Sequence, residues 1–198
     1  MENSGTEETK GIANCIKLIE DQKVREFVIR CLLAAPKYFW KIAASSSGNY
    51  HPIASLGKGG LARHTIIAVN YGISLCEKNS LTTLDRDIII AALLLHDTCK
   101  AGVENIENHS YYSQHAYLPR NYYKAIANQY LPEKSNIIFD LIDSHMGQWS
   151  EIPEKIPETK EQKITHYADY LASRKNQPIL NYADQITPLK TYDSSIIL

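Results

Sequence analysis

The chain has 198 residues, of which 44% are hydrophobic and 22% are charged, a balance typical of a folded domain and not of a disordered chain. Its 21 Lys and Arg residues nearly balance 22 Asp and Glu residues, so the net charge of -1 does not indicate a strongly basic nucleic-acid-binding surface. The longest uninterrupted apolar run, residues 88–95, is too short to cross a bilayer.

The first half of the chain reads mostly as helix. Residues 1–10 are expected to form a flexible tail. Apolar residues then recur at helical spacing over 12–35, with a break near Asp21. The Ser- and Gly-rich stretch 43–60 predicts a loop, and a second apolar pattern predicts a helix over 61–78.

A third helix is expected over 85–100, which contains the apolar run. Thr82 with Asp85 three residues later resembles a capping box at its start. Periodicity alone does not separate a buried helix from a buried strand here, but the Ala- and Leu-rich composition favours a helix.

The remaining segments continue the helical pattern. In chain order we expect a loop over 102–108, helices over 110–130 and 133–147 separated by Pro132, a loop over 149–158, a helix over 159–174 and an irregular tail over 176–198. The sequence therefore predicts an all-α helical bundle with a single domain over 11–175.

The composition also bears on the compartment. The polar, acidic N-terminal residues are unlike a secretory signal. The four cysteines are scattered and form no CxxC pair: Cys15, Cys31, Cys76 and Cys99. We expect free thiols in a reducing compartment, a cytoplasmic location and no membrane association.

His96 and Asp97 lie at the end of the most hydrophobic predicted helix. Titratable residues rarely end a buried run unless they are paired or bind a metal. The alternative is a solvent-facing last turn, where a histidine is favoured by the negative end of the helix dipole. The pair alone does not decide between the two interpretations.

Other predicted helices each offer one further side chain that is able to bind a metal: His64, His115, His145 and Asp169. Helical bundles build metal sites from imidazoles and carboxylates that project from facing helices into one core. Spacing across different helices does not by itself prove that these side chains converge.

Three motifs resemble those of the HD-domain superfamily of metal-dependent phosphohydrolases. They are GGLARHT (59–65), LLHDTCK (94–100) and HYADYL (166–171), and the resemblance covers about residues 50–175. The superfamily pattern H…HD…D is filled by His64, His96, Asp97 and Asp169. The resemblance implies an all-α HD domain with a metal site in its core.

One subgroup of the superfamily adds two histidines for a second metal, and His115 and His145 lie where that resemblance expects them. His109 competes for the first role, but His115 is favoured because it falls within a predicted helix. The run SHMGQW (144–149) and the GGLARHT segment look most like the HD domain of a bacterial 3′–5′ exoribonuclease family.

The sequence departs from the usual pattern in two respects. The common HD-Ile-Gly-Lys run is HD-Thr98-Cys99-Lys100 here, so the glycine is lost and Lys100 remains. No RNA-binding OB-fold precedes the motifs, so RNA is an open possibility and not an expected substrate.

The resemblance implies a two-metal hydrolase. The hypothesis is that His64, His96, Asp97 and Asp169 hold one divalent ion, and that Asp97 bridges to a second one held by His115 and His145. Such ligands suit Mn, Fe, Co, Ni, Zn or Mg. Two ions would activate a water as hydroxide for attack on phosphorus, and Lys100 would stabilise the developing charge. The expected substrate is a nucleotide or another small phosphoester, cleaved by phosphodiesterase or phosphomonoesterase activity.

Four more residues are candidates with equally simple structural explanations. His51, Lys58 and Arg63 are candidates for substrate binding, whereas the alternative for the two cations is a solvated surface. His166, one turn before Asp169, either orients a metal ligand or packs in the core.

Two other functions remain open from the residues. The same six ligands resemble those of mixed-valent di-iron HD oxygenases, which metal identity and oxygen consumption would distinguish. A non-catalytic ligand-binding HD protein is the second alternative. The tail over 176–198 either lies over the bundle or pairs with another subunit in a homo-oligomer.

Overall fold

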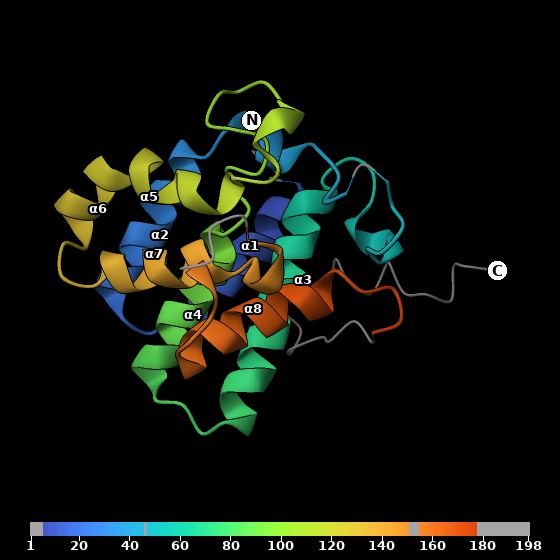
Figure 1. Cartoon of the computed structure of the whole chain (residues 1–198). Helices are drawn as coiled ribbons and strands as arrows, with labels where there is room; N and C mark the ends of the chain where they lie inside the picture. Colours follow the sequence, from blue (N-terminus) through green and yellow to red (C-terminus); the bar gives the residue numbers. More distant parts are fainter. Residues whose placement is uncertain (1–5, 46, 151–154, 178–198) are drawn as a thin grey trace.

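Eight α-helices and short 3₁₀ turns make up the fold, and the computed structural model describes residues 6–45, 47–150 and 155–177 (Figure 1). The helices are α1 (Glu7–Lys17), α2 (Gln22–Ala34), α3 (Gly60–Lys78), α4 (Thr83–Leu95), α5 (Leu118–Tyr122), α6 (Lys124–Tyr130), α7 (Ser135–Ser144) and α8 (Lys160–Ala172). No β-strand occurs in these residues, so the predicted all-α class is confirmed.

Helix α3 is the central element of the bundle. Fifteen of its 19 residues are buried, because it is apolar on most of its circumference and its neighbours are α1, α4 and α8. Figure 1 shows α8 crossing α3. This crossing brings the first turns of α3 close to the last turns of α8, where two of the candidate residues lie.

The Gly-Gly pair that precedes α3 fits this crowded entry. Gly59 is the N-cap residue and has a φ of 75°, a left-handed conformation that favours glycine. A Cβ atom on Gly60 would overlap the carbonyl group of Ser55. The two glycines therefore let the preceding loop pass directly over the start of the helix.

Helix α4 has the predicted N-cap residue Thr82, but it begins two residues before the predicted start at 85 and ends earlier than predicted. The Thr82 hydroxyl accepts a hydrogen bond from the backbone N–H of Asp85 at 3.2 Å. The helix stops at Leu95 because the amide and hydroxyl of Thr98 both donate to the Leu95 carbonyl, at 3.2 and 2.7 Å. His96 is therefore the C-cap residue, and residues 97–101 form turns instead of the predicted helix.

The N-terminal prediction holds only in part. The break near Asp21 is confirmed, since the Asp21 carboxylate caps α2. The flexible tail over 1–10 is wrong for residues 7–10, which belong to α1. The N-terminus of helix α1 is stabilised by the Thr6 side chain and by the acidic residues Glu7 and Glu8 near the positive end of the helix dipole.

The continuous helix predicted over 110–130 is wrong. This stretch contains the 3₁₀ turns His109–Tyr111 and His115–Tyr117, followed by the short helices α5 and α6. Pro119 has no N–H and fixes its own φ, so it starts α5 and does not continue a preceding helix.

The last two predicted helices are confirmed with shorter bounds, as α7 and α8. Thr159 and Gln162 form a capping box at the start of α8. Most of the predicted tail, residues 178–198, lies outside the described residues.

The predicted free thiols are confirmed, because all four cysteines are buried and unpaired. Within the described ranges, no helix combines the length and the apolarity that crossing a bilayer requires.

Asp87 on α4 anchors the turn between α1 and α2, and we expect its loss to destabilise the fold. Its side chain is 1% exposed, and Oδ2 accepts backbone hydrogen bonds from Glu20 at 2.8 Å and Asp21 at 2.7 Å. Because Asp87→Ala leaves two amides without an acceptor, the free energy of unfolding should fall by about 2–3 kcal/mol in urea titrations. Glu104→Ala, at an exposed position in the loop after α4, is the control and should change it by less than about 0.5 kcal/mol. Equal effects of the two variants would contradict this role of Asp87.

Candidate metal centre

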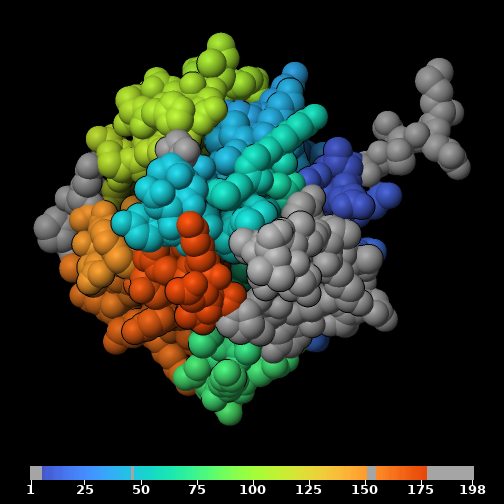
Figure 2. Space-filling model, turned by 90° about the vertical axis from the view of Figure 1, so that its right-hand side faces the viewer, coloured from blue at the N-terminus to red at the C-terminus, as the bar shows by residue number. Residues whose placement is uncertain are grey.

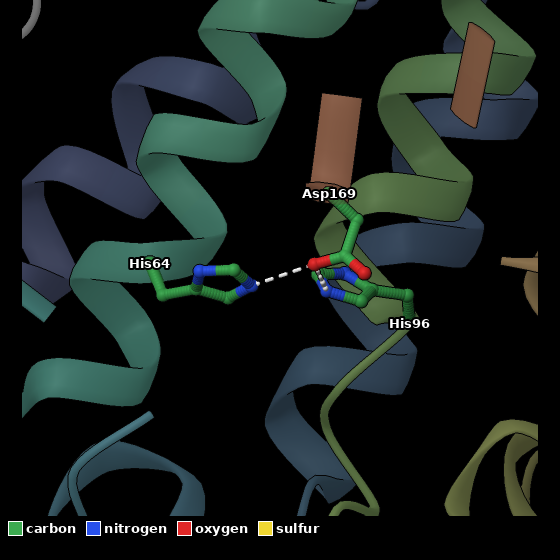
Figure 3. A group of neighbouring side chains, drawn as sticks. All are labelled: His64, His96 and Asp169. Carbon is green, nitrogen blue, oxygen red and sulfur yellow. Dashed lines mark hydrogen bonds and ion pairs between the residues drawn. The ribbon is translucent and has the colours of Figure 1, made fainter. Parts of the chain in front are cut away.

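His64, His96 and Asp169 come together from three separate helices. Oδ1 of Asp169 on α8 lies 2.9 Å from Nε2 of His64 on α3 and 3.5 Å from Nε2 of His96 at the end of α4. Figure 3 shows both imidazoles pointing at this carboxylate. One ligand atom from each residue lies within 4.8 Å of the others, a spacing that suits one metal ion.

Asp97 lies between this trio and two further histidines. Its side chain is 2% exposed, and its Oδ2 atom is 3.7 Å from Nε2 of His64 and 3.5 Å from Nε2 of His96. Its Oδ1 atom is 3.0 Å from Nε2 of His115 and 4.0 Å from Nε2 of His145. The two oxygens thus face different histidine pairs, which is the arrangement that a bridging carboxylate requires.

The Nε2 atoms of His115 and His145 face each other, and both can only accept a hydrogen bond. Nδ1 of His115 donates to the Tyr112 carbonyl at 2.6 Å, and Nδ1 of His145 donates to the Ile142 carbonyl at 2.7 Å. In a neutral imidazole, Nε2 then carries a lone pair, and these two Nε2 atoms are 3.1 Å apart. A cation that both lone pairs coordinate would turn this repulsive contact into a favourable one.

His96 follows the same pattern. Its Nδ1 atom donates to the Leu93 carbonyl at 2.7 Å, and its buried Nε2 atom has no hydrogen-bond partner among the described residues. A carbonyl that fixes the far nitrogen of a histidine is the usual way in which proteins orient a metal-binding imidazole. These hydrogen bonds leave the Nε2 atoms free to bind a metal, so the residues present fit a metal ion.

The electrostatics of the site favour positive charge at its centre. Burial alone would raise the pKa of Asp97 and Asp169, but Lys100 beside Asp97 and the neighbouring histidines hold both values well below the usual range. Burial alone would lower the pKa of His96, yet the two carboxylates raise it. For His145, burial prevails and lowers the pKa to about 3, so this ring stays neutral.

The fold fixes these side chains at the ends of elements. His96 and His145 are the C-cap residues of α4 and α7. His115 begins a 3₁₀ turn, whereas the sequence placed it inside a helix. Nε of Arg120 on α5 donates to the buried Asp143 carboxylate at 3.0 Å, which ties the segment after His115 to α7. The competing residue His109 is exposed, and its imidazole pairs with Glu107 instead.

An open pocket of about 230 Å³ lies over the cluster. Its lining includes the candidate residues Asp97, Lys100, His115, His145 and Asp169, and also His51, Tyr112, Met146, Trp149, His166, Tyr170, Ser173 and Arg174. Nζ of Lys100 is 2.6 Å from Oδ2 of Asp97. The His51 ring is 5.3 Å from the His64 ring, and burial lowers the pKa of His51 to about 3.

Two of the predicted substrate-binding residues do not line this pocket. Arg63 is buried, and its guanidinium donates to the carbonyls of Ala54, Leu56 and Lys58 and to the Glu8 carboxylate. It therefore fastens the loop before α3 and α1 to the helix. Lys58 is exposed on that loop.

His166 does not touch a ligand ring, but it fixes the backbone beside one. Its Nδ1 atom donates to the His145 carbonyl at 2.7 Å. The imidazole also fills the space next to Gly147, where a Cβ atom would overlap it and where φ is 57°. The glycine of the SHMGQW run is thus needed for this close approach.

Six lining residues are absent from the sequence-based set: Tyr112, Met146, Trp149, Tyr170, Ser173 and Arg174. The signal that identifies two of them is helical spacing. Tyr170 and Arg174 follow His166 at four-residue intervals, and residues four apart share one face of a helix.

Substitution of His115 tests how many metal ions this cluster can hold. In His115→Ala the trio of His64, His96 and Asp169 remains, while the second site loses an imidazole. We expect bound Mn, measured by elemental analysis after equilibration and desalting, to fall from about two ions per chain to about one, because second-site affinity drops by well over tenfold. His109→Ala is the matched control and should retain both ions. Full metal content in His115→Ala would contradict the second site.

A known protein family matches the part of the chain that holds this cluster. The HD domain family model matches residues 61–174, which include all six clustered residues. No curated protein and no solved structure matched the chain, so the narrower likeness to the exoribonuclease family has no support from them. Because the matched region covers more than half of the chain, the protein belongs to the HD domain family, most of whose members are metal-dependent hydrolases.

Proposed function

We propose that this protein is a metal-dependent phosphohydrolase that acts on a nucleotide or another small phosphoester, with two divalent ions per chain. The observation that carries the proposal is the position of Asp97, whose two carboxylate oxygens face separate histidine pairs at 3.0–4.0 Å. His64, His96 and Asp169 would complete one site, and His115 and His145 the other. Family membership supports this chemistry in its general form.

The charge of the pocket supports an anionic substrate. Among its lining residues, the carboxylates of Asp97 and Asp169 are balanced by the cations of Lys100 and Arg174. Each bound divalent ion would therefore leave two uncompensated positive charges. A phosphoester would supply the opposite charge in this pocket.

The chain contributes orientation and charge to the reaction. When bound, divalent ions polarise phosphoryl oxygens and lower the pKa of a coordinated water. Lys100 lies against Asp97 at the pocket wall, where its ammonium group can donate to a phosphoryl oxygen as negative charge develops on it. The neutral His51 imidazole lines the pocket beside His64, and its buried Nδ1 atom has no hydrogen-bond partner among the described residues, so it offers a hydrogen bond to substrate.

The test of the proposal is elemental analysis of anaerobically purified protein together with a phosphomonoester and phosphodiester screen in added Mn. About two metals per chain and turnover of a phosphoester are the expected results. Two irons with a mixed-valent signal, oxygen consumption and no hydrolysis would overturn the proposal in favour of oxygenase chemistry. Neither metal nor turnover would indicate a ligand-binding protein instead.

Asp97→Ala should abolish metal binding and turnover together, because this carboxylate faces both sites. We expect substoichiometric Mn and a fall in kcat of at least about 10³-fold. This fall is larger than the one expected from removal of a single charge-stabilising group. Circular dichroism would check that the variant is folded. A variant that retains its metal and its activity would be incompatible with the model.

Lys100→Met should reduce turnover while metal remains bound. The substitution removes the donor to the phosphoryl oxygen, so kcat should fall by about 10²-fold. Metal content is the second readout, since Asp97 keeps its four histidine neighbours. Lys124→Met, at an exposed position on α6, is the matched control and should leave kcat within twofold of the original, as expected for a surface change. Equal kcat values for the two variants would exclude a role for Lys100 in the reaction.

A further inference from the structure

The pocket rim near the end of α8 carries an aromatic and cationic cluster that the proposed hydrolysis leaves unused. The rings of Trp149 and Tyr170 are stacked, with centroids 5.7 Å apart and an angle of 8° between their planes. The guanidinium carbon of Arg174 lies 4.2 Å from the Tyr170 ring centroid and 5.8 Å from that of Trp149. We call these three residues the rim cluster.

A second segment borders the rim cluster. Figure 2 shows the loop before α3, in cyan, beside the end of α8, in orange-red. Tyr50 from this loop has its ring centroid 5.6 Å from the Arg174 guanidinium carbon. The guanidinium is therefore held by ring faces from three separate segments of the chain.

The rim cluster is continuous with the candidate metal centre. His166 donates to the His145 carbonyl, and its ring centroid lies 6.0 Å from that of Trp149 and 6.4 Å from that of Tyr170. All three residues of the rim cluster line the same pocket as Asp97 and Asp169. A molecule with its phosphate at the metal centre can thus extend along these rings to Arg174.

The guanidinium of Arg174 makes no direct contact with a carboxylate in residues 6–45, 47–150 and 155–177. No carboxylate there forms an ion pair with it, and no oxygen accepts a hydrogen bond from its guanidinium. Contact with ring faces leaves the donors at the edge of the planar guanidinium available, in a fixed orientation. This is the arrangement that suits a carboxylate or phosphate group.

Trp149 offers a flat surface beside this charge. Its side chain is 48% exposed although it lines the pocket. Large exposed aromatic residues next to a cation commonly bind nucleobases, because any base can stack on a ring.

We propose that the rim cluster binds the part of the substrate remote from the scissile phosphate, with a nucleobase packed on Trp149 and a second anionic group bound by Arg174. This inference rests on the proposed function, and it names the substrate class: a nucleotide with at least two anionic groups. A simple phosphoester without base or second charge would lack both contacts.

The test measures binding, independently of turnover. The probes are adenosine 3′,5′-bisphosphonate and adenosine 5′-monophosphonate, in which P–C bonds replace the ester bonds, added to the metal-loaded protein. Tryptophan fluorescence follows the titration. Stacking on Trp149 should quench the signal, and Trp149→Phe should remove most of the quenching, because Trp40 is then the sole remaining tryptophan.

Arg174→Gln should weaken binding of the bisphosphonate by about 10–100-fold, the value of a charge-assisted hydrogen bond, and affect the monophosphonate far less. Arg174→Lys should recover part of the lost affinity. Lys175→Gln, which removes an exposed charge one residue away, is the matched control and should change binding by less than twofold. If Arg174→Gln and Lys175→Gln bind the bisphosphonate equally well, the proposal fails.

A purely structural role of Arg174 would give a different pattern. Arg174→Gln would then lower the thermal midpoint and weaken both probes to the same extent, which would also overturn the proposal. The hydrolase proposal and the rim-cluster proposal have different failing outcomes. Arg174-dependent binding without any phosphoester turnover would refute the hydrolase but retain the rim cluster, whereas turnover with unchanged binding would refute the rim cluster alone.

Discussion

A buried negative charge at Asp97 is the constraint around which this molecule is organised. A carboxylate that is almost completely removed from water is costly unless cations or hydrogen-bond donors surround it. Lys100 supplies one charge directly, and four imidazoles approach the two oxygens from different elements. Helix α4 leads to this point through a wholly apolar run, so the charge stands where the most hydrophobic segment ends. The arrangement makes sense as a receptor for cations.

The same local hydrogen bond orients three of the four imidazoles. His96 and His145 each follow a helix directly, and each donates from Nδ1 to the carbonyl three residues earlier. His115 makes the same bond from a 3₁₀ turn. Few helix amides reach the last carbonyls of a helix, so the imidazole can donate to one of them while its other nitrogen turns into the site. At Ile142 the imidazole is the second donor, because the backbone N–H of His145 also donates to that carbonyl, at 3.2 Å. The same short-range interaction therefore caps an element and orients a candidate ligand.

The sequence predicted those features that local patterns determine. The order of His64, His96, Asp97 and Asp169 is readable because each lies in a distinctive short motif, and the structure brings these side chains together. Helical spacing of apolar residues and tyrosines predicted one helix over 110–130, whereas Pro119, which is visible in the sequence, starts a new helix there. His115 nevertheless lies in the cluster, since its position depends on packing against α7 and not on helical phase.

Arg63 shows most clearly what local sequence patterns do not predict. A cation beside a candidate ligand suggests contact with an anionic substrate, yet the guanidinium bonds three loop carbonyls that only the tertiary fold brings within reach. Arg174 is the opposite case, because nothing near it in sequence indicates that rings from two other segments surround it.

The distribution of the clustered side chains along the chain has a consequence for folding. His64 and Asp169 are 105 residues apart in sequence, and the other members come from three further segments. No fragment shorter than residues 64–169 contains the complete set, so a metal that binds it distinguishes the native state from nearly every partly folded one. Metal binding would then stabilise the native state as a whole. An ion present at 1,000 times its dissociation constant adds about 4 kcal/mol to the free energy of unfolding. In a cell, metal supply would thus set how long this protein survives proteolysis as well as whether it is active.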